Sequence, residues 1–138
     1  VDWEAVASAH VAPRNVTIWL PPGYDEGNRR YPVIYMHDGQ NVFVPGRAYG
    51  GEEWGVDEAL SGMIAAGRTR GTIVVGVWNT NLSGREYLPA KWVARLPEET
   101  RARIERVHGG PSIADDYLRF LVSELKPRID RTFRTRTG

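Results

Sequence analysis

The sequence predicts an α/β fold in which crossover helices cover a mostly parallel sheet. Two runs of strand length, Pro32–Met36 and Thr72–Trp78, are apolar on both faces, which is typical of strands buried inside a sheet. Between them, apolar residues recur at helical spacing from Val56 to Ile64, and Gly67 follows as a C-terminal cap. Strand, helix and strand in this order predict a right-handed parallel βαβ unit.

The segments on either side of this unit extend the same pattern. Asn15–Leu20 alternates apolar and polar residues and ends at two prolines, so we expect a half-buried antiparallel strand at the sheet edge. Pro97–Val107 predicts a short polar helix, and Ala114–Ile129 a longer helix that Pro127 kinks near its end. No repeat or linker divides the chain, so residues 1–138 form one domain or part of one.

Composition excludes several classes of protein. The 138 residues hold 18 Lys and Arg against 17 Asp and Glu, a net charge of +1 that gives no reason to expect a nucleic-acid partner. No apolar run reaches the length of a membrane span, so we expect a soluble chain with no membrane partner. The absence of cysteine excludes disulfides, thiolate metal sites and a cysteine nucleophile, and leaves the cellular compartment undecided between cytoplasm and secretion.

A small turn after the first buried strand is the most informative candidate site. Gly39, Gln40 and Asn41 stand where a strand of an α/β sheet meets its ligand-binding edge. A glycine there lets backbone N–H groups face the crevice and hold a developing oxyanion, although an ordinary turn explains the residues equally well. Aromatic residues near the loops at this edge would stack on a sugar or aryl group, or equally belong to the core: Trp54, Trp78, Tyr87 and Trp92.

The sequence offers no nucleophile elbow and no metal site. The closest match to G-x-S-x-G is Gly110–Ala114, but a charged helical segment precedes it, and Ser112 is better explained as the N-cap of the next helix. Glu52 and Glu53 favour interaction with a helix N-terminus over paired acid catalysis. We therefore expect neither metal nor cofactor. The chain has three histidines, none at zinc-ligand spacing: His10, His37 and His108.

Three strings closely resemble the putative-esterase family of α/β-hydrolases, which includes enterochelin, feruloyl and acetyl-xylan esterases, S-formylglutathione hydrolases and mycolyltransferases. They are Arg14–Tyr24, Tyr31–Asn41 and Gly51–Asp57, and the Y-M-H-D-G-Q-N within the second is the most specific. The resemblance continues through Ile73–Asn79, Arg85–Pro89 and Tyr117–Asp130.

The resemblance implies a serine esterase that cleaves a small-molecule ester, such as a carbohydrate-linked or aryl ester, without a cofactor. In that family the N–H after the Asp-Gly pair forms half of the oxyanion hole, and here that residue is Gln40. The resemblance further implies that five residues border the substrate: Asp38, Gly39, Asn41, Trp54 and Tyr87.

The same resemblance implies that the catalytic triad is not in this chain. Family members place the G-x-S-x-G serine after the helix that corresponds to Ala114–Ile129, and the acid and histidine later still. Because the sequence stops at Gly138, we expect the amino-terminal half of an α/β-hydrolase, truncated before the nucleophile elbow and inactive by itself.

Two alternatives remain. A non-catalytic half-domain would bind a carbohydrate or aryl ligand through Trp54, Trp78 and Tyr87, or would pair with a complementing carboxyl-terminal half or another copy that covers its open sheet edge. The third hypothesis, a hydrolase that uses Ser112, predicts that Ser112→Ala abolishes activity.

Overall fold

The computed structural model describes residues 1–136 and divides into two compact units. The first comprises Val1–Val6, Arg14–Asn79 and the described part of Arg128–Gly138. The second comprises Ala7–Pro13 and Thr80–Pro127. Within the described residues, no helix is long and apolar enough to cross a membrane.

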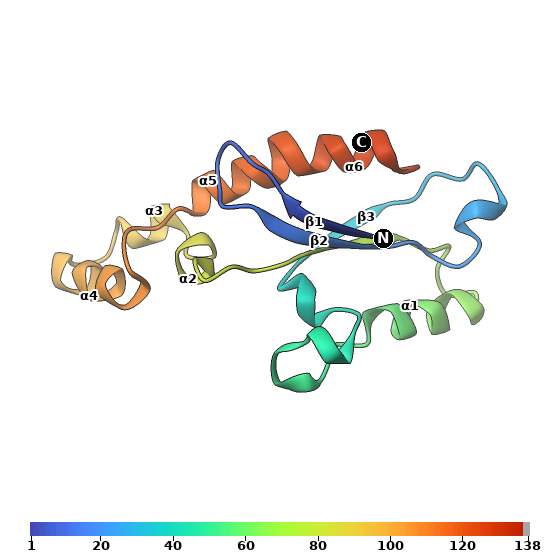
Figure 1. The fold of residues 1–138 in the computed structure, drawn as a ribbon, viewed down its shortest axis with the longest axis horizontal. Coiled ribbons are helices and arrows are strands. Elements are labelled where there is room, and N and C mark those ends of the chain that lie inside the picture. Colours follow the sequence, from blue (N-terminus) through green and yellow to red (C-terminus); the bar gives the residue numbers. More distant parts are fainter. Residues whose placement is uncertain (137–138) are drawn as a thin grey trace. The chain divides into compact units, whose positions relative to one another are not determined.

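The first unit is built on a mixed four-stranded sheet (Figure 1). The strands, in spatial order, are β1 (Asp2–Val6), β2 (Arg14–Trp19), β4 (Ile73–Val77) and β3 (Val33–His37). β2 pairs antiparallel with both β1 and β4, and β3 alone pairs parallel with β4. The expectation of a mostly parallel sheet is therefore wrong, because the two antiparallel pairs at the amino-terminal side outnumber the parallel one.

β2 confirms the strand predicted from the alternation in Asn15–Leu20, but it is not an edge strand. Val16 and Ile18 are buried on one face, while the residues between them are half-buried. β1 covers its outer side, with Trp3 opposite Val16. The sequence did not predict β1, since Asp2–Val6 is short and only Val6 is buried.

The parallel unit β3–α1–β4 follows the prediction. α1 spans Val56–Ala65, and the chain leaves it through Gly67, whose φ of 67° is a left-handed conformation that glycine adopts without strain. β4 is buried along its whole length because strands flank it on both sides. β3 was expected to be fully buried, and this is wrong: it lies at the sheet edge, and Ile34 remains 45% exposed.

The chain after the last helix returns to the outer side of β3. α6 (Lys126–Thr132) is followed by a parallel bridge between Tyr31 and Thr135. The Tyr31 N–H donates to the Arg134 carbonyl, and the Arg136 N–H donates to the Tyr31 carbonyl, both at 2.8 Å. Thr135 is fully buried, and its hydroxyl donates to Asp130 at 2.7 Å. Residues 134–136 thus pair with Tyr31, which lies just before β3 begins.

Helices of the first unit cover both faces of its sheet. Figure 1 shows α1 on one side and α6 on the other. On the α6 side, Trp3 stacks on Phe133 with ring centroids 5.9 Å apart, and the Arg128 guanidinium lies 4.1 Å from the Trp3 centroid. The innermost side chains of this unit lose all contact with water: Val16, Val42, Ile73, Val74, Val75 and Ile129.

The second unit is helical. It contains α2 (Ser83–Glu86), α3 (Ala90–Val93), α4 (Glu98–His108), α5 (Ala114–Arg119) and a π-helix at Phe120–Leu125 that leads into α6. α4 confirms the predicted polar helix. A kink was expected at Pro127, and the structure has the π-helix just before it. There the Lys126 N–H bonds to the Leu121 carbonyl, five residues earlier, so the backbone bonding is shifted by one residue ahead of the proline, which has no N–H.

Candidate functional site

The turn after β3 is held in an unusual backbone conformation. Asp38 has φ 54° and ψ 44°, the left-handed region that non-glycine residues seldom adopt, and a 3₁₀ turn follows at Gly39–Asn41. The Asn41 N–H donates to the Asp38 carbonyl at 2.8 Å, and the Val42 N–H to the Gly39 carbonyl at 3.4 Å. The N–H of Gln40 is not a donor in these bonds that close the turn.

Gly39 allows this turn to lie directly on the neighbouring strand. A Cβ at Gly39 would be 2.3 Å from the carbonyl carbon of Gly76 and 2.7 Å from the nitrogen of Val77. A Cβ at Gly76 would in turn lie 3.1 Å from the Gly39 Cα. Gly39 therefore requires glycine for this close approach, while a side chain at Gly76 would be tight against the turn, and the contact fixes the distance of the turn from β4.

Asn79, which follows β4, holds the turn with two hydrogen bonds. Its side-chain Nδ2 donates to Asp38 Oδ1 at 2.7 Å, and its backbone N–H donates to Gln40 Oε1 at 3.2 Å. Sequence reasoning did not single out Asn79. Its position in the sequence could have indicated it. Asn79 comes just after β4 and Asp38 just after β3, and parallel strands end at the same edge of a sheet.

Asn41 connects the turn to the loop that follows it. Its side-chain Oδ1 accepts the Tyr49 N–H, and its carbonyl accepts the Trp54 N–H, both at 2.8 Å. The loop includes short 3₁₀ turns at Pro45–Arg47 and Tyr49–Gly51. Tyr49 is 91% exposed and Trp54 is 52% exposed, so two aromatic side chains stand in solvent beside the turn.

A hollow of about 360 Å³ opens over the turn. It brings together three residues that the sequence predicted, Asp38, Gln40 and Asn41, while Gly39 lies buried beneath them. Trp54 is not part of its wall, and Tyr87 belongs to the second unit, so the roles expected for these two side chains remain predictions. Four residues complete the wall without having been predicted there: Arg47, Ala48, Tyr49 and Asn79.

Arg47 is fixed at the side of this hollow. Its guanidinium bonds to Asp2 Oδ2 at 3.0 Å and lies 5.9 Å from the Trp78 ring centroid. Asp2 also accepts the Thr17 hydroxyl at 2.7 Å, and Thr17 accepts the Trp78 indole N–H at 3.0 Å. The Thr17 hydrogen bond, followed by the hydrogen bond and charge of Arg47, lowers the pKa of Asp2. A second hollow of about 180 Å³ lies around this network.

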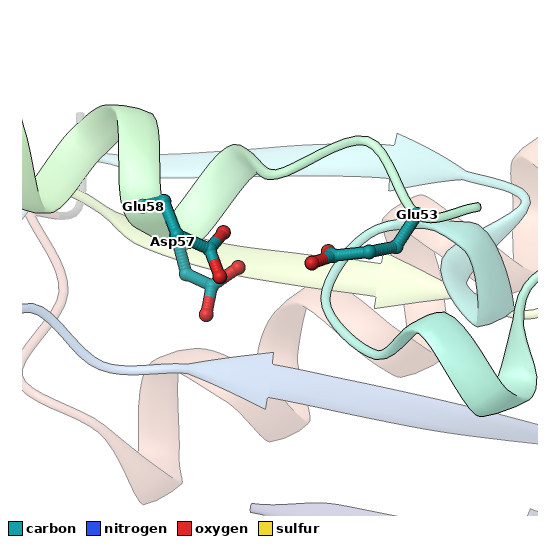
Figure 2. Close-up of side chains that lie close together, drawn as sticks. All are labelled: Glu53, Asp57 and Glu58. Atoms are coloured by element: carbon teal, nitrogen blue, oxygen red, sulfur yellow. The ribbon is translucent and has the colours of Figure 1, made fainter.

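Three acidic side chains meet at the start of α1 (Figure 2). The carboxylate oxygens of Glu53, Asp57 and Glu58 lie within 4.8 Å of one another. Burial raises the pKa of Asp57, and the nearby charges of Glu58 and Glu53 raise it further. Glu53 accepts the Gly55 N–H at 3.2 Å, while Asp57 and Glu58 stand in the first turn, where the helix dipole favours negative charge. This placement accounts for the cluster.

Ser112 and Tyr87 lie in the second unit. The Ser112 hydroxyl donates to the Leu88 carbonyl at 2.5 Å and accepts the Ala114 N–H at 3.2 Å. The helix N-cap is Ile113, one residue later than expected, but the serine still serves the helix start. The Tyr87 ring packs 5.5 Å from that of Tyr117, a contact typical of a core residue.

Comparison with known protein families assigns this chain to a family. The profile of the Putative esterase family matches residues 8–138. The chain belongs to this esterase family. The turn at Asp38–Asn41 lies wholly within the matched region. A search of curated proteins gave no match.

Solved structures share the fold of this esterase-family chain. An IroE-like serine hydrolase from Shewanella oneidensis superposes with a TM-score of 0.66 at 23% identity, over 98% of this chain and 39% of its own. The BES protein from Bacillus cereus gives 0.63 at 21%, over 98% and 47%. A ferulic acid esterase from Anaeromyces mucronatus, in complex with ferulic acid, gives 0.58 at 19%, over 100% and 44%. The chain thus spans less than half the length of each.

Proposed function

We propose that this chain is the amino-terminal half of a serine carboxylesterase and supplies one donor of its oxyanion hole, the N–H of Gln40. The observation that carries the proposal is the turn at Asp38–Asn41. Gly39 seats the turn against Gly76, and the hydrogen bonds that close it use the N–H groups of Asn41 and Val42. Membership of an esterase family supports the same chemistry.

The proposed reaction places a serine, a histidine and an acid in residues that follow Gly138. The serine oxygen attacks the ester carbonyl carbon while the histidine takes the serine proton, and the carbonyl electron pair moves onto oxygen. The N–H of Gln40 and the N–H after the serine donate to this oxyanion. Collapse expels the alcohol, which receives the proton, and water then releases the acid by the same steps. Removing one such donor costs about 10²–10³ in kcat.

The bridge between Tyr31 and Thr135 supports this location for the serine. It is parallel and is made by Tyr31, just before β3, the strand at the edge of the sheet, begins. A strand that continued in the same direction would run along β3 toward His37 and end beside Asp38. A nucleophile on the turn after such a strand would face the hollow that Gln40 lines.

For the substrate, we infer an ester that carries an aryl or carbohydrate group. The exposed rings of Tyr49 and Trp54 beside the turn offer flat apolar faces on which either group stacks. Asp38 and Asn41 line the hollow together with Tyr49 and offer polar atoms there. One solved structure of the same fold is a complex with ferulic acid, which supports the aryl form. A kcat/KM higher for methyl ferulate than for ethyl acetate supports it; the reverse order contradicts it.

The test uses a fluorophosphonate probe, which phosphonylates an activated serine, followed by intact-mass spectrometry of two proteins. The full-length protein should gain one adduct, and residues 1–138 alone, of 15.5 kDa, should gain none. No adduct on the full-length protein overturns the proposed function. An adduct on residues 1–138 overturns the placement of the serine, and loss of that adduct in Ser112→Ala would assign it to Ser112.

A second candidate is a non-catalytic half-domain that binds its ligand or pairs with another chain. The position of β3 at the sheet edge and the exposed side chain of Ile34 favour the pairing form. This candidate predicts that no length of the natural protein reacts with the probe.

A further inference from the structure

We propose that Asn79 is a positioning residue that sets the direction of the Gln40 N–H. The inference rests on the proposed function, because the N–H matters for catalysis only if it faces an oxyanion. Asn79 itself does not touch the reacting atoms; it acts through Asp38 and Gln40.

Asn79 contacts the turn on both sides of Gly39. The side-chain Nδ2 bonds to Asp38 Oδ1 at 2.7 Å, ahead of Gly39, and the backbone N–H bonds to Gln40 Oε1 at 3.2 Å, after it. The plane of the peptide between Gly39 and Gln40 carries the proposed donor. The two bonds to Asn79 restrain the residues on either side of this peptide, and they add to the long bond of 3.4 Å from the Val42 N–H to the Gly39 carbonyl, which is too weak to fix the peptide's orientation alone.

The turn needs such a restraint because its first residue is strained. Asp38 holds φ 54° although it carries a side chain, and residues in that region relax unless their surroundings hold them. Gly39 has no side chain to anchor it. Contact with Gly76 fixes the position of Gly39 above β4, and within the turn the peptide that follows Gly39 accepts the Val42 N–H at its carbonyl over a long 3.4 Å.

The amide group is the side chain suited to this role. Nδ2 is a donor that meets a carboxylate acceptor, whereas an aspartate at position 79 would bring a second carboxylate to the same place. The charged and titratable groups that share the hollow with Asn79 are Asp38, Arg47 and Tyr49, and the Arg47 guanidinium already bonds to Asp2 at 3.0 Å. A second carboxylate would therefore meet Asp38 in a hollow whose arginine, Arg47, is already paired with Asp2.

The test compares Asn79→Ala, Asn79→Asp and Asn81→Asp in the full-length protein, with p-nitrophenyl acetate as substrate between pH 5 and 9. For Asn79→Ala we expect kcat to fall roughly 10- to 100-fold with KM nearly unchanged, somewhat less than the loss of a whole oxyanion donor. Asn81 is exposed two residues further on, so Asn81→Asp adds the same charge without the contact and should keep the wild-type profile.

Asn79→Asp gives the readout that a merely structural role would not produce. At low pH the new carboxyl and Asp38 share one proton, which replaces the lost hydrogen bond, and kcat should stay near that of the wild type. As pH rises, the shared proton leaves and the two carboxylates repel each other, so the kcat of Asn79→Asp should fall more than about tenfold. The wild-type kcat should instead rise over the same interval, as its histidine loses its proton.

The outcomes separate this inference from the proposed function. If the wild type hydrolyses the ester and both Asn79 variants keep its kcat at every pH, the role of Asn79 is overturned and the function stands. If the wild type has no turnover, the function fails, and the Gln40 amide resonance of ¹⁵N-labelled Asn79→Asp decides the positioning role. A resonance that moves with pH, and does not move in Asn81→Asp, supports the role; an unchanged resonance refutes it.

Discussion

Replacing Gly39 by alanine should break the backbone contact between Gly39 and Gly76 on which the candidate site depends. The new Cβ would lie 2.3 Å from the Gly76 carbonyl carbon and 2.4 Å from its oxygen, whereas real Cβ contacts are essentially never shorter than 3.0 Å. The turn or β4 must therefore move by at least the difference, 0.7 Å. Both neighbours are backbone atoms of a strand held by ladders on two sides, so no side chain can swing aside.

The cost follows from this displacement. Overpacking of a rigid site costs about 1–3 kcal/mol, and weakening a β3–β4 ladder bond adds about 1 kcal/mol, so we expect a loss of about 3 kcal/mol. For 138 residues this lowers Tm by roughly 10 °C. Gly46→Ala is the matched control, because nothing lies within 4 Å of a Cβ at that position. Urea unfolding followed by circular dichroism measures both variants. A Gly39→Ala midpoint equal to that of the control would refute the reasoning.

Three further predictions follow from the first unit. Burial and then Asp130 raise the pKa of Tyr35 to about 12, so the unfolded chain ionises first and stability falls as pH rises from 10 toward 12; Tyr35→Phe should lose less over this interval in urea titrations. The pKa of Asp2 is lowered, so its half-exposed pair with Arg47 stabilises the fold above the ordinary aspartate pKa; Asp2→Asn should cost less than about 1 kcal/mol at pH 7, and this cost should shrink as pH falls below that ordinary value. Residues 1–138 alone should self-associate through the β3 edge, and a clean monomer at high concentration in analytical ultracentrifugation would contradict this.

Periodicity predicted most of the elements because burial imposes it. The apolar run at Thr72–Trp78 became a fully buried strand, and the stripe from Val56 to Ile64 became α1, since each pattern matches one face or both faces of its element. β1 escaped prediction because an exposed edge strand has no need of apolar alternation.

The edge position of β3 could not be read from its sequence. Pro32–Met36 is as apolar as a central strand, and the pattern does not say which neighbour covers it. Ile34 of this strand is exposed. On the side of β3 away from β4, the described residues pair only at Tyr31, just before the strand begins.

The candidate site was predicted in part. The residues of the Asp38–Asn41 turn were found from their place after a buried strand, and the wall of the hollow includes three of them. Asn79 and Arg47 were not found, because their contacts depend on strand register and on the folding of a loop. Tyr87 packs on Tyr117, and its expected place beside the substrate stays a prediction.

The most direct test of the central claim observes the Gln40 amide itself. The full-length protein, labelled with ¹⁵N, is treated with a phosphonate probe whose tetrahedral oxygen stands in for the oxyanion of the ester intermediate. If the Gln40 N–H is a donor of the oxyanion hole, its proton resonance shifts downfield on formation of the adduct, as expected for a new charge-assisted hydrogen bond. A stoichiometric adduct that leaves the Gln40 resonance unchanged would contradict the account.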